Sequence, residues 1–405
     1  MHPPDQLPVK YPGTAVVLDM SPTGLTVARS LSAHGVTVYG VDERTWEVGH
    51  FSKTVRSDRA IQYEGPGSSL ADGLVRLAIQ LRERPVLFVA GDKYLEFVAE
   101  YYSTLKEVYV LTESMRPEAL TVLLDKRQFY EKCRSLNVPL PQTFFPASTE
   151  EATHISSIIR YPAIVKPVLG YLVRDRLKGR KLVEVSDSKS LVEWWDRFRE
   201  WGTESVLQEC IIGPESNIAV AALYIDRYGT CLSAFTAQKI RQYPPIYGSG
   251  SYVQARWYPQ LVEDSVQLLR RLNFHGVCGT EYKLDERDGV WKMVEVNCRP
   301  VLWYALSRVA GIDVVWDAYS DLCGHPNPIQ TGSQNNRKRW QLIVRDVPAG
   351  IHAIYRRSLS MRDVFHQFVN PRNRVEAVFA WDDWRVNVGY VWNTYMHLRS
   401  MLRRS

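Results

Sequence analysis

The stretch that decides the fold is a pair of segments, Gly279-Thr280-Glu281-Tyr282-Lys283 and Val294-Glu295-Val296-Asn297-Cys298-Arg299, with the turn-forming residues Asp285-Glu286-Arg287-Asp288-Gly289 between them. The intervening residues favour a turn, so the two segments are expected to pair as an antiparallel hairpin. A three-residue loop, Arg287-Asp288-Gly289, with glycine in the left-handed region would place Glu281 directly opposite Glu295. Because strand side chains alternate, one face would then carry the polar residues Glu281, Lys283, Glu295, Asn297 and Arg299.

This polar face predicts a metal site. Two carboxylates and an amide oxygen that converge repel one another unless a cation lies between them. Hard oxygen ligands suit Mg²⁺, whose remaining ligands are usually phosphate oxygens and water, and Arg299 is suited to a second anion. Charges on a solvated hairpin face are the simpler interpretation, although Glu and Asn are depleted in strands.

Composition limits the class of protein. A chain of 405 residues, 45% hydrophobic and 23% charged, has room for two or three globular domains. The net charge of +6 fits anionic small ligands, and no Lys/Arg-rich run indicates nucleic acid. Six scattered cysteines without CxxC spacing indicate reduced thiols and a cytoplasmic protein. No apolar run approaches the ~20 residues of a membrane span, so no membrane partner is expected.

The first 120 residues read as a small α/β domain. Residues 14–19 and 36–41 have the apolar character of strands, with a helix from Ser21 to about residue 34 between them, which is a βαβ unit. Asp42 would suit a dinucleotide ribose, but Met20-Ser21-Pro22-Thr23-Gly24 is not the GxGxxG pattern, which argues against NAD. A strand over 86–90, a helix to about 102 and a strand over 108–111 are expected to follow.

Residues 121–324 show an α+β pattern with much antiparallel sheet. A helix capped by Asp125 is followed by strands at 163–166, 205–211, 218–225 and 231–239 and by helices near 188–201 and 262–272. A Pro/Asn/Gly/Gln-rich linker over 324–337 predicts a boundary. The remainder, 325–405, is an aromatic and basic C-terminal extension.

Several cations could meet phosphates. Lys166 ends an apolar strand, where an ammonium is costly without an anion, although a lysine can also extend to solvent. Lys126 begins a helix, the unfavourable end for a cation unless a phosphate is bound. Lys239 and Arg241 share a strand face before a Pro/Gly-containing loop at 243–251, typical of a lid, or are simply solvated charges. Residues 208–215 end a strand in an apolar segment. The backbone groups of this segment could bind the edge of an adenine, or the segment is only a strand end and a turn.

The order and spacing of these parts resemble the ATP-grasp superfamily of carboxylate–amine and carboxylate–thiol ligases. The parts are Asp125-Lys126, Tyr161-Pro162-Ala163-Ile164-Val165-Lys166-Pro167, residues 208–215, and the closing Glu295-x-Asn297-x-Arg299 with the upstream Glu281. The resemblance covers roughly residues 5–320, and residues 239–252 resemble the carboligase branch related to D-aspartate ligases. It implies an α/β domain followed by an α+β ATP-grasp domain. The nucleotide would lie between a lid-containing subdomain, 121–205, and a metal-binding catalytic subdomain, 206–324.

The resemblance also implies the cofactors, ATP with Mg²⁺ or Mn²⁺, and a role for individual residues. The metal ligands would be Glu281, Glu295 and Asn297. The nucleotide would be bound by Lys126, Lys166, Lys181, Gln208, Glu209, Ile211 and Glu215. The acyl-phosphate and tetrahedral intermediate would be stabilised by Arg299 with Lys239 or Arg241. One departure is the loop 170–181, which is bulky and basic where the family is glycine-rich, so that either Lys181 replaces backbone amides or turnover is altered or lost.

The expected function is an ATP- and Mg²⁺-dependent ligase that activates a carboxylate as an acyl-phosphate and joins it to an amine. Catalysis would rest on positioning and electrostatics, and the partners would be small-molecule carboxylate and amine substrates. Two alternatives stay open: a nucleotide-binding sensor or scaffold without turnover, and a kinase that phosphorylates a hydroxyl. The sequence leaves open the substrates' identity and a homo-oligomeric state.

Overall fold

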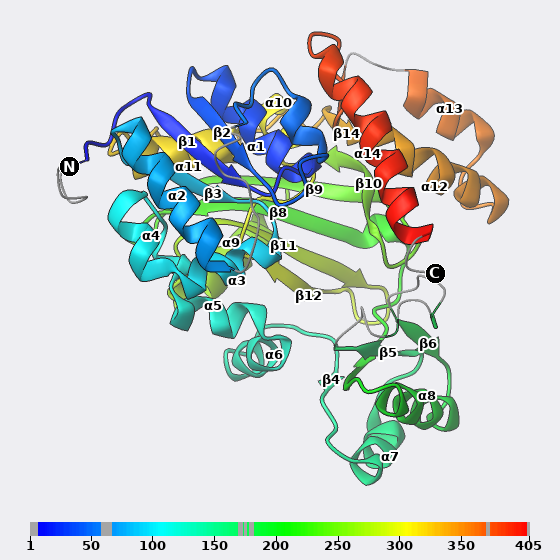
Figure 1. Ribbon diagram of the computed structural model, residues 1–405. Coiled ribbons are helices and arrows are strands. Elements are labelled where there is room, and N and C mark those ends of the chain that lie inside the picture. Colours follow the sequence, from blue (N-terminus) through cyan, green and yellow to red (C-terminus); the bar gives the residue numbers. More distant parts are fainter. Residues whose placement is uncertain are drawn as a thin grey trace. The chain divides into compact units, whose positions relative to one another are not determined.

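The computed structural model describes residues 7–57, 67–168, 173, 176–177, 182–369 and 373–402 (Figure 1). The chain divides into two compact units. Unit 1 comprises Met1–Leu123, Ala219–Thr280 and Val296–Ser405, and unit 2 comprises Leu124–Ile218 and Glu281–Glu295. The end of the first segment lies close to the boundary expected at residue 120, whereas the further division at 205 and 324 stays a prediction.

Unit 1 opens with a parallel sheet of order β2-β1-β3, formed by β1 (Thr14–Leu18), β2 (Thr37–Val41) and β3 (Val86–Val89). Helix α1 (Pro22–Ala33) connects the first two strands, with Pro22 at its start and the Ser21 side chain accepting from the Thr23 N–H. The expected βαβ unit is therefore present. Asp42 accepts the Met20 N–H at 2.8 Å, so its carboxylate helps to hold the turn after β1.

The strand expected over residues 108–111 is wrong. Helix α3 (Asp92–Glu100) is followed directly by α4 (Tyr102–Val108), and only a single bridge joins Val110 to Val86. The apolar side chains of Tyr102, Leu105 and Val108 are buried with the three-residue spacing of a helix face, and α4 packs against α2 (Gly67–Leu81).

The main sheet has the order β12-β11-β8-β9-β10-β14-β15, and β13 also pairs with β9. Its strands are β8 (Ile218–Ile225), β9 (Cys231–Tyr243), β10 (Ser249–Ala255), β11 (Gly276–Asp285), β12 (Val290–Asn297), β13 (Gln330–Thr331), β14 (Arg339–Gln341) and β15 (Arg374–Glu376). Strands β9 and β10 are antiparallel and adjoin across the 244–248 loop. Helix α9 (Pro259–Arg271) packs against β9.

The C-terminal residues complete this sheet. The Gln334 amide donates to the Thr236 carbonyl and accepts the Thr236 N–H, each at 2.9 Å, and β14 pairs with β10. Beyond it, α12 (Ile343–Tyr355) packs on β9 and β10, α13 (Met361–Val369) contacts α12, and α14 (Trp384–Leu402) packs on the short helix η2 (Val48–Phe51). Helices α10 (Tyr304–Val309) and α11 (Val314–Leu322) pack on α1. The extension is thus part of unit 1.

Unit 2 is built on an antiparallel sheet of order β4-β7-β5-β6. The strands are β4 (Thr143–Phe144), β5 (Ala163–Pro167), β6 (Val183–Val185) and β7 (Ser205–Glu209), and the helices are α6 (Lys126–Ser135), α7 (Thr149–Ile158) and α8 (Ser188–Glu200). Helix α8 buries Leu191, Trp195 and Phe198, spaced four and three residues apart, against a core that includes Val165 and Leu207.

Candidate active site

The hairpin of β11 and β12 has a four-residue loop, so the expected three-residue loop is wrong. Strand β11 ends at Asp285 and β12 begins at Val290, and the Gly289 N–H donates to the Asp285 carbonyl at 2.8 Å. Gly289 has φ +69°, the left-handed conformation that was expected of it. The Asp285 carboxylate accepts the Arg287 N–H at 3.1 Å, which holds the additional residue inside the turn.

Around the residues assigned to the metal, less buried polar residues alternate with buried ones. Glu281 is partly buried while Tyr282 is buried, and Glu295 is exposed and Asn297 partly buried on either side of buried Val296. Within the described chain, no group of three or more His, Cys, Asp or Glu residues is arranged to hold a metal by itself. Two Glu and one Asn are oxygen donors that fit Mg²⁺ only when phosphate oxygens or water supply the other ligands.

Helix α6 supports the hairpin inside unit 2. The Tyr130 hydroxyl donates to the Val294 carbonyl at 3.1 Å and accepts from the Gln208 amide at 2.9 Å. Burial, with a further contribution from the nearby charge of Glu295, raises the pKa of Tyr130 to about 12. Glu295 is therefore placed beside a neutral, hydrogen-bonded phenol.

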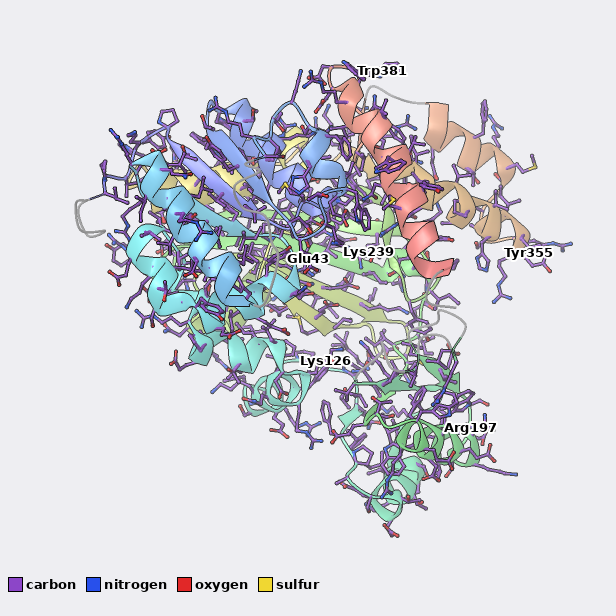
Figure 2. The ribbon with its side chains drawn as sticks, viewed as in Figure 1. Glu43, Lys126, Arg197, Lys239, Tyr355 and Trp381 are labelled. Atoms are coloured by element: carbon purple, nitrogen blue, oxygen red, sulfur yellow. The ribbon has the colours of Figure 1, made fainter. Side chains whose placement is uncertain are left out.

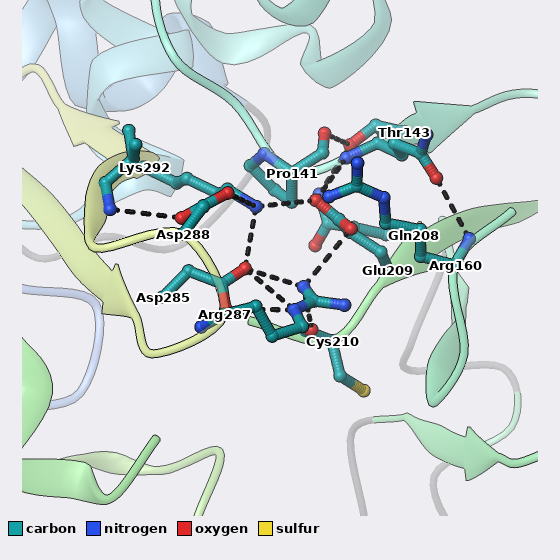
Figure 3. Close-up of polar contacts among 12 residues, drawn as sticks. Pro141, Thr143, Arg160, Gln208, Glu209, Cys210, Asp285, Arg287, Asp288 and Lys292 are labelled. Atoms are coloured by element: carbon teal, nitrogen blue, oxygen red, sulfur yellow. Dashed lines mark hydrogen bonds and ion pairs between the residues drawn. The ribbon is translucent and has the colours of Figure 1, made fainter. Parts of the chain in front are cut away.

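A buried ion cluster ties the hairpin tip to the end of β7 (Figure 3). The Lys292 ammonium lies 2.7 Å from Asp285 and 3.0 Å from Glu209, and the Arg287 guanidinium lies 2.6 Å from Asp285 and 3.2 Å from Glu209. Asp285, Glu209 and Lys292 are each at most 5% exposed. Lys292 and the two carboxylates are thus buried, whereas Arg287 is partly exposed at the edge of the cluster and a third carboxylate, Asp288, lies 3.3 Å from Lys292.

The same cluster fixes the backbone of residues 209–212, the segment expected to read adenine. Arg287 donates to the Cys210 carbonyl at 2.9 Å, and the Glu286 N–H donates to the Ile212 carbonyl at 3.0 Å. The Cys210 N–H donates to the Pro162 carbonyl at 2.8 Å. These bonds hold the segment, including Ile211, between β5 and the hairpin tip.

Two residues assigned to the nucleotide already have partners within unit 2. The Gln208 amide donates to the Thr143 hydroxyl at 2.7 Å as well as to Tyr130, and the Glu209 N–H donates to the Gln142 carbonyl at 2.9 Å. The Glu209 carboxylate accepts the Gln142 N–H at 3.1 Å. The adenine contacts of Gln208, Glu209 and Ile211 remain predictions.

The turn after this segment requires glycine. Gly213 has φ +138°, and a Cβ there would lie 2.5 Å from Nδ2 of the Asn217 side chain. Glu215 follows in the short helix η5 (Glu215–Asn217). Burial lowers the pKa of Lys283, while the nearby groups of Cys210, Asp285 and Glu215 act in the opposite direction, so this lysine lies close to the turn.

The lysines assigned to phosphate lie in different environments. Lys126 is exposed at the first position of α6, after Asp125, whose carboxylate accepts the Gln128 N–H at 3.0 Å as expected (Figure 2). Lys166 is partly buried on β5, opposite Val206 of β7. Lys181 lies outside the described residues. None of these positions tests phosphate binding, which stays a prediction.

In unit 1, Lys239 and Arg241 are both buried on β9. Arg241 donates to both oxygens of Asp346 at 2.8 and 2.6 Å and lies 4.6 Å from the centre of the Tyr252 ring. Ser251 and Gln341 also donate to Asp346, at 2.9 and 2.6 Å. The hydrogen bonds of Arg241 are thus largely used inside the fold, and its catalytic role stays a prediction.

Arg299 forms a two-pronged ion pair with Asp92 inside unit 1. Its Nε and Nη2 donate to the two Asp92 oxygens at 2.6 and 2.8 Å. Asp92 is the first residue of α3, directly after the turn that follows β3. The geometry orients the guanidinium and limits its rotation.

Comparison with known proteins supports an assignment of the fold. No profile of a known protein family matches the chain. The D-aspartate ligase of Enterococcus faecium (strain Aus0004) is 22% identical over 306 residues, which are 73% of this chain and 72% of that protein. The biotin carboxylase of Campylobacter jejuni, solved as a β-γ-ATP complex, superposes with a TM-score of 0.62 at 15% identity and covers 80% of this chain and 74% of that chain.

Two further structures agree. The biotin carboxylase domain dimer of Hydrogenobacter thermophilus 2-oxoglutarate carboxylase, solved with MgADP, ADP and bicarbonate, has a TM-score of 0.60 at 14% identity and covers 80% of this chain and 73% of that chain. An L-amino acid ligase from Bacillus licheniformis has a TM-score of 0.57 at 16% identity and covers 81% and 78%. The chain has the ATP-grasp fold. The fold implied by the sequence resemblance is thereby confirmed.

Sequence reasoning missed the ion pairs made by four residues: Arg287, Lys292, Asp92 and Asp346. Arg287 and Asp285 were interpreted only as turn residues. A signal was present at Lys292, a lysine between Trp291 and Met293 in a strand, where a charge needs a partner. Asp92 follows the carboxyl end of a parallel strand, the edge where functional residues of α/β sheets gather.

Proposed function

We propose that this protein is an ATP- and Mg²⁺-dependent ligase that activates a carboxylate as an acyl-phosphate and joins it to an amine. The observation that carries the proposal lies within unit 2. The hairpin that bears Glu281 and Glu295 is tied by a buried ion cluster to the 209–212 segment expected to bind adenine. A metal site and a nucleotide site held together in this way suit phosphoryl transfer from ATP.

Different residues of the chain would bind the nucleotide, the metal and the reacting groups. Residues 209–212 would offer backbone groups to adenine, and Lys126, Lys166 and Lys181 would bind phosphates. Glu281, Glu295 and Asn297 would hold Mg²⁺, or Mn²⁺, which accepts the same oxygen ligands. When bound, the metal would neutralise charge on the transferring phosphoryl group. Arg299, held by Asp92, would stabilise the oxyanion that forms when the amine attacks the acyl-phosphate.

The relatives support the substrate class. A D-aspartate ligase and an L-amino acid ligase are named for amino-acid substrates, so amino acids are the first carboxylates and amines to test. We keep the cytoplasmic location in this proposal, since all six cysteines are free and a reducing compartment maintains thiols. No helix in the described chain combines the length and apolar character needed to cross a bilayer.

The test combines product analysis with one matched pair of variants. The protein is incubated with ATP, Mg²⁺ and mixtures of amino acids, and ADP, phosphate and any new amide are measured. Glu295→Gln should reduce turnover by about a hundredfold to a thousandfold because a ligand of the metal that stabilises the transferring phosphoryl group is lost. Glu193→Gln, on the exposed face of α8, should leave it unchanged.

The products separate the alternatives. ADP and phosphate released together with an amide support the ligase. Nucleotide binding without any product would instead indicate a sensor, and a stable phosphorylated hydroxyl compound would indicate a kinase. Full ligation by Glu295→Gln would contradict the metal assignment while leaving the ligase intact.

A further inference from the structure

The C-terminal helices of unit 1 leave many large apolar side chains exposed. Helix α12 buries Ala349, Gly350 and Ala353 on its inner side, and α14 buries Val386, Gly389 and Tyr390. On their outer sides, both helices and α13 carry a second set of apolar side chains. This C-terminal apolar face consists of Val344, Val347, Ile351 and Tyr355 on α12, Met361 and Phe365 on α13, and Trp384, Val388, Val391, Trp392 and Tyr395 on α14.

The spacing shows that these residues form stripes. On α14 they recur at intervals of four, three, one and three residues, and on α12 at intervals of three, four and four, which places each set on one side of its helix. Tyr355 is 83% exposed and Trp384 is 67% exposed. Helices α12, α13 and α14 lie at one side of unit 1, and Tyr355 and Trp381 lie at the periphery of that unit (Figures 1 and 2).

The charge of the chain is concentrated in the same segment. Residues 337–405 contain 13 Arg and Lys against 5 Asp and Glu, a net charge of +8, whereas the remaining residues, with 37 against 39, have a net charge of −2. Four arginines of the described chain, Arg345, Arg356, Arg357 and Arg385, are exposed on α12, after it, or on α14. Basic side chains therefore border the apolar stripes.

A cavity of about 580 Å³ opens beside the face, between η2 and α14. Its polar lining includes Lys53, Arg385 and His50, and its apolar lining includes Phe51, Trp384 and Val388. Trp384 and Val388 belong to both the cavity and the C-terminal apolar face. Lys53 is paired with Asp382 at 2.8 Å, and burial lowers the pKa of His50 to about 4, so Arg385 is the cavity's main source of positive charge. A cavity that carries this arginine and continues into an apolar surface matches a phosphate group attached to hydrocarbon.

We propose that the C-terminal apolar face docks on the surface of an anionic phospholipid bilayer, with a lipid phosphate in the cavity beside α14. Aromatic and aliphatic side chains would enter the boundary of the headgroups while the arginines meet anionic lipid. Trp and Tyr are the residues that favour this boundary. No membrane partner was expected from the sequence because it has no spanning segment, which a docked helix does not need.

Other occupants fit the observations less well. A symmetric contact between two copies would bring identical surfaces together, and with them two segments of net charge +8. Nucleic acid would match the charge, but contacts to its phosphates leave rows of Val, Ile and Met side chains without an apolar partner. Only a surface that is both anionic and apolar satisfies both features.

The proposal is tested by vesicle flotation of the full chain, using phosphatidylcholine vesicles with and without phosphatidylglycerol. Binding is expected only to the anionic vesicles and should weaken as salt is added. The double variant Arg356→Gln/Arg357→Gln should weaken binding on the order of twentyfold, from about fivefold for each charge removed. Trp384→Ser/Trp392→Ser should abolish it.

Matched exposed positions outside the face serve as controls. Tyr228→Ser, 76% exposed in the turn between β8 and β9, and Lys189→Gln on α8 should bind like the unmodified protein. Light scattering after size-exclusion chromatography reports the mass of each variant in solution. Absence of flotation with either vesicle, or loss of flotation in the controls, would overturn the proposal. A dimer that Trp384→Ser/Trp392→Ser dissociates would also overturn it, in favour of a second copy.

Discussion

The most demanding prediction concerns Lys292, which bridges the two buried carboxylates of the ion cluster. In Lys292→Met the side-chain volume is nearly kept, but Asp285 and Glu209 are left with Arg287 as their remaining cation. Breaking a buried ion pair by removing one partner costs about 3–5 kcal/mol. Since about 1.4 kcal/mol is a factor of ten, the open population of this part of unit 2 should rise at least about a hundredfold.

Amide hydrogen exchange is the suitable assay because it reports each segment separately. Peptides that span β7 and the hairpin of β11 and β12 should lose protection in Lys292→Met, and ATP affinity should fall with it, since Cys210 and Ile212 are held by the hairpin tip. Lys189→Met is the control. Its ion pair with Glu193 is 4.0 Å long and exposed, so less than about 1 kcal/mol should be lost.

A compensating variant tests whether charge balance is what stabilises the ion cluster. Lys292→Met/Glu209→Gln removes one charge of each sign and leaves Asp285 paired with Arg287, so it should recover much of the lost protection. If Lys292→Met exchanges like Lys189→Met, or if the double variant is no better protected than the single one, the cluster does not stabilise this segment through charge balance.

The same cluster predicts a response to acid. Burial alone would raise the pKa of Asp285, but hydrogen bonds from Arg287 and Lys292 hold the pKa well below its usual value. A lowered pKa stabilises the folded state above the ordinary pKa near 3.8, and that stability is lost only as the pH falls through the lowered value. Protection of the hairpin should therefore persist well below pH 4 in the unmodified protein and end at higher pH in Lys292→Met.

Three further predictions concern other parts of the chain. Burial raises the pKa of Glu47 to about 7 despite Arg44 at 2.9 Å, so the stability from its protonated form is full below about pH 4.5 and is lost as the pH rises through 7. Glu47→Gln should flatten the pH dependence of thermal stability between pH 5 and pH 8. An unchanged pH profile would show that Glu47 is not the group that titrates. Asp92→Asn should lower ligase kcat about tenfold with little change in KM, because Arg299 loses its orientation. The exposed control Glu96→Gln should have no effect. Equal kcat values for the two variants in a turnover assay would refute a positioning role for Asp92. Gly213→Ala should destabilise unit 2 by about 1–3 kcal/mol in urea unfolding and should weaken ATP binding. Gly35→Ala should cost less, because φ is also positive there but no atom lies within 4 Å of the added Cβ. Equal losses in the two variants would show that the close contact at Gly213 does not matter.

The parts of the fold that sequence predicted are those set by local pattern. The apolar run of β1, the Ser21 cap and Pro22 lie within a few residues of one another, and so do the Asp125 cap and the helix α6 that it begins. The hairpin of β11 and β12 was found in the same way. Its loop length was not, because the extra residue depends on the Asp285 side chain folding back onto Arg287.

The ion cluster could not be derived from local pattern because its partners are distant in sequence. Lys292 and Glu209 are 83 residues apart, and Arg299 and Asp92 are 207 apart. A charged residue in a strand shows that a partner is needed, but not which one. This difference has a functional consequence: residues 209–212 owe part of their position to the hairpin tip, which is distant from them in sequence. A substitution at the tip should therefore change nucleotide affinity without touching the nucleotide, whereas one on the exposed face of α8 should not.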